Sequence, residues 1–374
     1  MLKQGSTVFV TGATGLIGGE LVRSLVRQPV GKVRALVRPA PHAAPAHRLT
    51  ERFVRSGEDP VSAARLGVRA VAGDVSMTRL GLSDSAYDEV RREADIIIHS
   101  AAETSFIRAV ACQKTNIAGA ENLIEFTRQC KRAPLLVCLS TAYVSGVVQN
   151  ACISEDDFRP ENAHHNEYTH SKAVAEQLFR KSGLPVLVVR PSVVLSAGLP
   201  CPAFARAILQ FVPLLQHFDA VPINPAARAD VVPVQFVVDS IIRLLQVPEL
   251  KHDCYHISAG EHGTANMEQL ARVVDRFYGR QALLRTIAPS QWTRELHRQY
   301  MHGPDQRRAF SALKNYLPFL NMNVLYDNTR LRQALGERFP GLLPLNAYMG
   351  ELLSLVATDE RAARRLRPGR TSQA

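Results

Sequence analysis

Residues 6–28, STVFVTGATGLIGGELVRSLVRQ, decide the fold of this chain. A short apolar segment typical of a strand runs into a glycine-rich turn, and the residues after the turn have helical spacing. Gly12, Gly15 and Gly18 form the pattern GxxGxxG. Glycine permits a tight turn, close packing of helix on strand, and close approach of a pyrophosphate to backbone N–H groups at the helix amino terminus. The stretch therefore predicts a dinucleotide site. The other turn residues expected to bind the cofactor are Thr14, Leu16 and Ile17.

Beyond this stretch, the chain continues to alternate between strand and helix patterns. Apolar runs of strand length recur at 32–38, 68–74, 94–100, 134–140 and 185–192, and helical spacing recurs at 107–131 and 166–182. Strands that recur with helical crossovers predict an α/β fold, with a doubly wound parallel sheet of the Rossmann type. In such a sheet the ligand lies at the carboxyl ends of the strands.

The length of the chain suggests a second, smaller substructure. A sequence of 374 residues with 46% hydrophobic content can form one large core with an added subdomain. We expect a nucleotide-binding domain over 1–260, with an excursion at about 197–229 into a mainly helical substrate subdomain formed by 261–374. The apolar segment 203–218, AFARAILQFVPLLQHF, is compatible with core, with the wall of an acyl tunnel, with a dimer contact or with peripheral membrane contact.

The formal net charge of +11 predicts an acidic partner or ligand. Nucleic acid is not expected, because the sequence has no basic stripe with interleaved aromatic residues, no zinc finger and no RNA-recognition signature. Several arginines fall in the last residues, 359–374, which are expected to be a solvated basic tail.

Targeting signals and cysteine spacing favour a reducing compartment. The amino terminus has no apolar signal core, and the apolar stretch 184–199 is interrupted by Arg190 and Pro191, so neither a secretory signal nor a membrane span is expected. The six cysteines never fall as CxxC and have no metal-like spacing to histidine. A reduced cytoplasmic protein without a metal site is the expectation.

Two arginines predict which dinucleotide is bound. In NAD-binding folds, a carboxylate about 20 residues beyond the glycine pattern accepts the ribose 2′-OH. Here that position is Arg38, at the end of the second expected strand, and Arg48 follows ten residues later across a loop rich in proline and alanine. A guanidinium offers permanent charge and several donors to a 2′-phosphate. We therefore expect NADPH, although either residue is also compatible with an ordinary surface arginine.

Further candidates for cofactor contact follow the third and fourth expected strands. Asp74, with Val75 in AGDV, can accept a hydrogen bond from the adenine amino group or can cap the next helix. Ala101 and Ala102 are small, as a cofactor lying close to the backbone requires. Asn116 can hold a backbone or ribose network near the active site, and a buried asparagine satisfied by the protein is an equal alternative.

The segment 165–179, HNEYTHSKAVAEQLF, carries the candidate chemistry. Tyr168 and Lys172 stand four residues apart and therefore share one helical face. A free tyrosine has a pKa of about 10, and a neighbouring ammonium with an oxidised nicotinamide is expected to lower it and make the phenol a usable acid and base. Lys172 can also donate to the nicotinamide ribose. Ser140 and Thr141 end the fifth expected strand, where a hydroxyl can hold the substrate oxygen beside the phenol.

Together these motifs resemble the extended short-chain dehydrogenase/reductases over about residues 5–260. The shared elements are TGxxGxxG, the Asp-Val pair, the Ser/Thr-containing fifth strand, YxxSK and the RPSVV segment that contains Pro191. Within that superfamily, LVR followed ten residues later by HRL, then HSAAETSF and ADVVPVQFVVDSII, are most similar to fatty acyl-CoA reductases and carrier-protein thioester reductases. The region beyond about 265 matches only loosely.

The resemblance implies a role for each matching position. Tyr168 would be the acid/base, Lys172 its partner and a cofactor ligand, and Thr141, favoured over Ser140 by counting back from Gly146, would bind the substrate oxygen. It also implies NADPH-dependent reduction of an acyl thioester, on CoA or an acidic acyl-carrier protein, to an aldehyde. The cofactor-binding residues would be Gly12, Thr14, Gly15, Leu16, Ile17, Gly18, Arg38, Arg48, Asp74, Val75, Ala101, Ala102, Asn116, Lys172 and Pro191.

Two other functions use the same residues. A reductase or epimerase acting on a ketone, steroid or nucleotide sugar uses the same Thr/Tyr/Lys machinery. A non-catalytic nucleotide sensor of the same fold is the other alternative, and the presence of all three catalytic candidates speaks against it. The sequence does not decide the acyl chain, the oligomeric state, or whether the aldehyde is reduced further to an alcohol.

Overall fold

The computed structural model describes residues 1–374 apart from 60, 62–66, 196–212 and 355–374. Most of the apolar segment 203–218 and all of the arginine-rich tail therefore lie outside the described residues. The contacts divide the chain into two compact units. The first unit comprises 1–194, 230–262 and 324–342, and the second comprises 195–229, 263–323 and 343–374.

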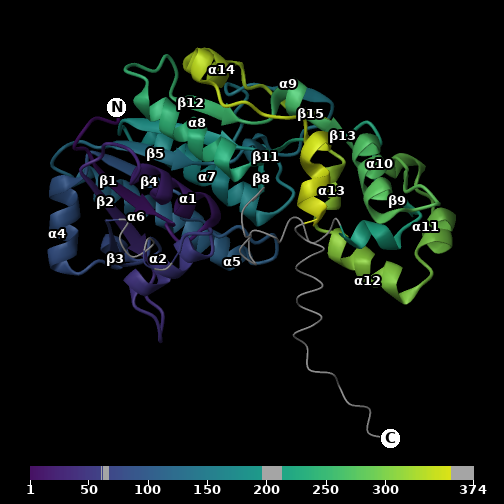
Figure 1. The fold of residues 1–374 in the computed structure, drawn as a ribbon, viewed down its shortest axis with the longest axis horizontal. Helices are drawn as coiled ribbons and strands as arrows, with labels where there is room; N and C mark the ends of the chain where they lie inside the picture. The colour runs from purple at the N-terminus through teal and green to yellow at the C-terminus, as the bar shows by residue number, and fades with distance from the viewer. Residues whose placement is uncertain (60, 62–66, 196–212, 355–374) are drawn as a thin grey trace, which may run out of the picture. The chain divides into compact units, whose positions relative to one another are not determined.

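A seven-stranded parallel sheet forms the centre of the first unit (Figure 1). Its spatial order is β12-β7-β5-β4-β1-β2-β3. The chain reverses its direction of travel across the sheet between β1 and β4, which is where a doubly wound fold binds its ligand. The predicted Rossmann-type sheet is thus confirmed. The strands are β1 Thr7–Thr11, β2 Lys32–Val37, β3 Val68–Ala72, β4 Ile96–His99, β5 Leu135–Leu139, β7 Val186–Pro191 and β12 Cys254–Ile257.

Helices cover both faces of this sheet. On one face α4 (Asp84–Glu93), α6 (Ala118–Arg128) and α7 (Glu167–Lys181) contribute to a core cluster in which the ring of Phe126 lies 5.8 Å from Phe9 of β1. On the other face α1 (Leu16–Leu25) packs on α8 (Val234–Gln246). Alternation of side chains along each strand supplies apolar groups to both layers.

Shorter elements complete the first unit. Residues 324–342 return to it, because β15 pairs with β6 and α14 packs against α8 and β12. A π-helix, η2, interrupts the helical segment between α5 and α6. The bounds are α2 Pro45–Val54, η1 Thr78–Gly81, α5 Ala109–Cys112, η2 Gln113–Ile117, η3 Ala142–Ser145, β6 Ala151–Ile153, β8 Val193–Leu195, β11 Val231–Pro233, α9 Gly260–Gly263, β15 Val324–Tyr326, α14 Thr329–Leu335 and η7 Gly336–Arg338.

The second unit has its own small core around Phe218, Met267 and Leu313. Its longest described helix, α10 (Met267–Tyr278), begins with a capping box between Asn266 and Gln269. The remaining elements are η5 Pro213–His217, β9 Ala220–Val221, β10 Arg228–Ala229, β13 Ala265–Asn266, β14 Arg285–Thr286, η6 Pro289–Gln291, α11 Arg294–Tyr300, α12 Pro304–Leu313 and α13 Leu317–Leu320.

Candidate active site

The glycine-rich turn lies directly after β1 and is packed against the end of β4. Gly12 has φ +72°, and a Cβ on it would lie 2.5 Å from the backbone nitrogen of Ala101. A Cβ on Gly18 would collide with the backbone oxygen of Gly12. Only glycine fits both positions, because the clashing atoms are backbone atoms that cannot move aside. The turn is therefore tightly packed and forms a backbone cradle at the amino terminus of α1, which begins at Leu16 and suits a phosphate.

A buried arginine that sequence reasoning missed supports this turn. Arg52 of α2 is 3% exposed and donates from Nε to the backbone oxygen of Gly15 at 3.0 Å. Its Nη2 donates to the backbone oxygen of Leu16 at 3.1 Å and pairs with Glu20 at 3.0 Å. Arg52 therefore ties α2 to the glycine turn. The available signal was its place four residues after Arg48 on an amphipathic helix, but nothing local distinguishes it from a surface arginine.

The two arginines expected at a 2′-phosphate lie together at the carboxyl end of β2. Arg38 directly follows that strand and is exposed. Arg48, on α2, donates a side-chain hydrogen bond to the backbone oxygen of Arg38. The loop between them thus folds back, and the Arg48 guanidinium lies against the exposed Arg38 at the strand end where a ribose is bound in this fold.

Asp74 and Val75 form a turn after β3. The Oδ1 atom of Asp74 accepts a hydrogen bond from the backbone nitrogen of Ser76 at 2.9 Å, so the carboxylate stabilises its own turn. Val75 is 4% exposed, and its backbone oxygen accepts a hydrogen bond from Asn122 at 2.9 Å. The second carboxylate oxygen of Asp74 has no hydrogen bond assigned to it among the described residues.

Asn116 is buried in the π-helix η2 and bridges two elements of the site. Its side chain accepts from the backbone nitrogen of Glu103 at 2.8 Å and donates to Ser171 of α7 at 2.9 Å. These contacts are those of the alternative given for Asn116, a buried asparagine whose hydrogen bonds are made within the protein. Ala101 donates its backbone N–H to Thr11 at 3.3 Å, and Ala102 is half-buried beside it.

Tyr168 and Lys172 lie on the first turns of α7, whose amino end is capped by Asn166. The ring of Tyr168 stacks on Phe106 with 6.0 Å between centroids. Lys172 is 6% exposed and donates from Nζ to the backbone oxygen of Leu139 at 2.6 Å. The lysine is thereby anchored to the last residue of β5, one turn along the helix from the phenol.

The structure separates the two hydroxyls at the end of β5. Thr141 is 5% exposed, lies close enough to the Tyr168 phenol to lower its pKa, and donates to the backbone oxygen of Pro191 at 3.4 Å. Ser140 faces the other way and donates to Glu176 at 2.6 Å. Residues from β5, α7 and β7 therefore meet at one point, at the carboxyl edge of the sheet.

Burial dominates the electrostatics of this point. It raises the pKa of Tyr168 to about 12, and the nearby Thr141 side chain only partly offsets this. It also lowers the pKa of Lys172 to about 8. The direction for Tyr168 in the protein alone is opposite to the lowering expected from the sequence beside an oxidised nicotinamide, because loss of hydration is the largest effect on the phenol. Tyr168 therefore holds its proton at neutral pH and is ready to donate it.

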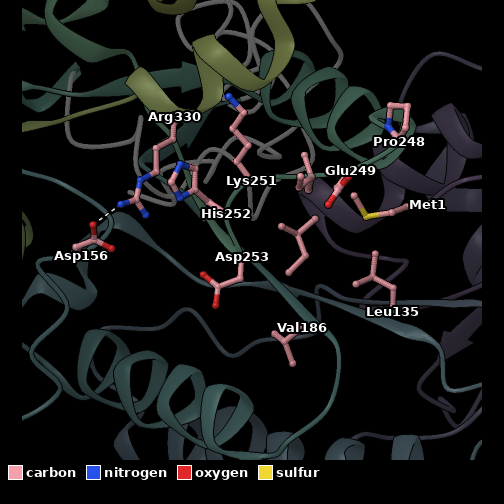
Figure 2. A pocket seen from close by; sticks show the side chains of 12 residues that line it. Met1, Leu135, Asp156, Val186, Pro248, Glu249, Lys251, His252, Asp253 and Arg330 are labelled. Atoms are coloured by element: carbon pink, nitrogen blue, oxygen red, sulfur yellow. Dashed lines mark hydrogen bonds and ion pairs between the residues drawn. The ribbon is translucent and has the colours of Figure 1, made fainter.

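A pocket of about 810 Å³ lies at the opposite edge of the sheet. Figure 2 shows Leu135 and Val186, the first residues of β5 and β7, beside Asp253, which precedes β12. The ion pair between Arg330 and Asp156 closes one side of it. None of Thr141, Tyr168 and Lys172 lines this hollow, which therefore has no part in the candidate chemistry.

Three properties of the described residues complete the picture. They contain no group of three or more side chains suited to hold a metal ion. The five cysteines within the described ranges are free thiols. In this same part of the chain, every helix is too short or too polar to cross a membrane.

Comparisons with known proteins agree on the family and the fold. A family model described as "Male sterility protein" matches residues 10–241. The "Aldehyde reductase lnaA" of Aspergillus flavus is 25% identical over 92% of this chain and 35% of the relative. The chloroplastic "Fatty acyl-CoA reductase 2" of Arabidopsis thaliana is 22% identical over 74% of this chain and 58% of the relative. The chain thus spans about a third and somewhat over half of these two relatives.

Among solved structures, the terminal R domain from the myxalamid PKS-NRPS biosynthetic pathway has the same fold. It superposes with a TM-score of 0.78 over 96% of this chain and 93% of that chain, at 22% sequence identity. The overlap extends beyond the sheet to nearly the whole length of both chains.

Proposed function

The chain belongs to the male sterility protein family of extended short-chain dehydrogenase/reductases, and from this premise we propose that it reduces an acyl thioester to an aldehyde with NADPH. The observation that carries the proposal is the meeting of Thr141, Tyr168 and Lys172 at the carboxyl edge of the sheet, beside a turn that only glycine can form. The reductase relatives and the R-domain fold support the substrate class.

The residues present suit a nicotinamide dinucleotide. Gly12 packs directly on the backbone of Ser100 and Ala101, and this keeps the turn tight at the amino terminus of α1, where backbone N–H groups can meet a pyrophosphate. Leu16, Ile17 and the glycines would hold the pyrophosphate, and Lys172 would hold the nicotinamide ribose. When bound, the dinucleotide supplies the hydride.

The protein's own part in the reaction is to bind charge and move a proton. Thr141 and Tyr168 would donate hydrogen bonds to the oxygen of the thioester carbonyl as negative charge develops there. Because Tyr168 is protonated at neutral pH, it can transfer its proton to that oxygen and leave a neutral hemithioacetal.

The second half of the reaction reverses this proton transfer. The Tyr168 phenolate takes the hydroxyl proton back, the carbon–oxygen double bond forms, and the carbon–sulfur bond breaks. The departing thiolate then takes a proton from water. No covalent bond to the protein is required.

NADPH is proposed over NADH because Arg38 and Arg48 converge at the end of β2. The exposed Arg38 guanidinium can approach a 2′-phosphate from solvent, and the hydrogen bond from Arg48 keeps the second cation close. No acidic residue takes the place of Arg38 directly after the strand.

We infer that the thioester is presented by an acidic carrier protein or by CoA. The formal charge of +11 attracts both, and the attraction weakens with salt. The R domain with the same fold comes from a PKS-NRPS biosynthetic pathway, which favours the carrier protein. We further place the reaction in a reducing, cytoplasmic compartment, in line with the free thiols of the described cysteines.

The decisive experiment offers the purified chain NADPH together with acyl-CoA and acyl-carrier thioesters of several chain lengths. Thiol release and NADPH consumption are followed in the same sample, with Tyr168→Phe as the inactive control. One NADPH for each thiol identifies an aldehyde product, and two identify an alcohol. Turnover of a ketone, steroid or nucleotide sugar, without thiol release from any thioester, would replace this proposal by the reductase/epimerase alternative.

A further inference from the structure

A buried carboxylate lies directly behind the catalytic residues. Glu176 is 2% exposed and stands one helical turn after Lys172 on α7. It accepts hydrogen bonds from Arg190 at 2.6 Å and from Arg180 at 2.9 Å. Its other oxygen accepts from Ser140 at 2.6 Å. Burial by itself would raise the pKa of Glu176, but the two arginines hold it below the ordinary value, so the group is charged.

The partners of Glu176 are immediate neighbours of the catalytic groups. Ser140 precedes Thr141 at the end of β5. Arg190 precedes Pro191, whose backbone oxygen accepts the Thr141 hydroxyl. The carboxylate therefore joins the carboxyl ends of β5 and β7 to the helix that carries Tyr168.

We propose that Glu176 and Ser140 are positioning residues that hold Thr141 against Tyr168 by clamping the ends of β5 and β7 to α7. The proposal rests on the function proposed above for Thr141 and Tyr168. Neither Glu176 nor Ser140 touches the reacting atoms, and both act through their neighbours.

The geometry argues for more than a stabilising ion pair. A buried ion pair adds little net stability over apolar packing, because desolvation offsets most of the attraction. The guanidinium groups of Arg180 and Arg190 already neutralise the charge of Glu176. The hydrogen bond from Ser140 adds a directional contact to the residue next to Thr141, and such contacts fix a backbone position rather than only neutralising a charge.

The same carboxylate lies close enough to Lys172 to favour its ammonium form. The titratable groups that face Lys172 are His99 of β4, Cys138 of β5, and Tyr168 and Glu176 of α7. Cys138 and Glu176 each raise the pKa of Lys172 against the effect of burial. His99 is kept neutral, since burial and Lys172 lower its pKa to about 3. Glu176 is thus the permanent anion of the group.

The first test is Ser140→Ala, which removes one hydrogen bond and leaves the Glu176–Arg190 pair intact. We expect kcat to fall by about 10- to 100-fold, the effect of a small displacement of a catalytic group, with NADPH affinity within about twofold of wild type. Ser140→Thr keeps the hydroxyl and should restore most of kcat. The matched control is Ser182→Ala, which removes a 2.6 Å hydrogen bond to the backbone oxygen of Phe179 at the far end of the same helix.

The second test is Glu176→Gln, read through the pH profile. Loss of the carboxylate should move the alkaline limb of kcat/KM to lower pH, because Lys172 then loses its proton earlier. Melting temperature is measured alongside, so that a folded variant is compared with folded wild type.

The proposal is overturned if Ser140→Ala has wild-type kcat with only a lower melting temperature, since the contact would then be structural. Loss of kcat in Ser140→Ala that Ser140→Thr fails to restore also overturns it. The tests use whichever carbonyl substrate the wild type reduces. Failure of the thioester proposal is therefore recognised separately, by absence of thiol release in the wild type.

Discussion

The proposed cofactor cradle at the glycine turn and the proposed catalytic junction at Thr141 and Tyr168 occupy the same edge of one sheet but are built in different ways. The cradle comes from one continuous stretch of chain, in which β1, the glycine turn and α1 follow one another. The junction draws Thr141, Tyr168 and Pro191 from three separate elements. Backbone shape makes the first, and side chains held by buried charges make the second. The comparison suggests that the two regions fail differently when mutated.

The largest expected effect is the loss of catalysis in Tyr168→Phe. Removing the phenolic oxygen removes proton transfer and one donor to the substrate oxygen, so kcat should fall by about 100- to 10,000-fold. NADPH affinity should stay near wild type, because the cradle is untouched. Stopped-flow turnover and cofactor titration check both quantities, with Tyr87→Phe in the core as the control. Near-normal turnover would remove Tyr168 from the acid/base role.

Lys172→Ala is expected to affect both the cradle and the junction. The ammonium is anchored to the end of β5 and is also the proposed ribose ligand, so both kcat and NADPH affinity should decline. The same two measurements separate this variant from Tyr168→Phe. A loss confined to kcat would show that Lys172 does not contact the cofactor.

Gly12→Ala is expected to disturb the cradle without changing the junction. A Cβ at φ +72° is strained and also meets the backbone of Ser100 and Ala101, for a total cost of about 2 to 5 kcal/mol in unfolding free energy or in cofactor affinity. Gly183→Ala is the matched control, because Gly183 has φ +74° with no atom within 4 Å of an added Cβ. Chemical denaturation and NADPH titration are the measurements. Equal effects of the two substitutions would contradict the close-approach argument.

Arg38→Ala tests cofactor choice without disturbing the cradle backbone. Loss of a charge-assisted contact should weaken NADPH binding by about 1 to 3 kcal/mol and leave NADH binding nearly unchanged. Titration with both cofactors measures the difference directly. If both weaken equally, Arg38 does not contact the 2′-phosphate.

The smallest expected effect is a decline of kcat/KM with rising pH, which originates at Lys172. Lys172 has a folded-state pKa of about 8, below its ordinary value, so it loses its proton as pH rises through that value. The kcat/KM of the free enzyme should therefore fall above about pH 8, by about tenfold per unit, if the ammonium is needed. Measurements of kcat/KM from pH 6 to 10 should show the same decline above about pH 8 in wild type and in Arg38→Ala. A flat profile would exclude the ammonium.

The lowered pKa of Lys172 also affects the stability of the protein. Because the folded-state pKa of Lys172 lies below the unfolded value, the unfolded chain binds more protons between the two. The contribution of this group to the free energy of unfolding therefore increases with pH through that window, while activity declines. Activity and stability should move in opposite directions above about pH 8.

Much of this architecture was predictable because its signals are local. The strand, glycine turn and helix at 6–28 are consecutive, and Tyr168 and Lys172 share a face because of helical periodicity alone. Arg52, Ser140 and Glu176 carry no such signal. The contacts that matter here, from Arg52 to Gly15 and from Ser140 and Arg190 to Glu176, join residues distant in sequence. Only the burial of Arg52 and Glu176 distinguishes them from surface charges.

The sequence by itself determined the doubly wound sheet, the glycine turn and the tyrosine–lysine pair, since these follow from backbone conformation and the spacing of neighbouring residues. Tertiary structure decided that Ser140 donates its hydrogen bond to Glu176, and that burial raises the pKa of the phenol of Tyr168. It also decided that 324–342 returns to the first unit. These outcomes depend on which distant elements pack together and on how much water they exclude, and neither is encoded in any one stretch of the chain.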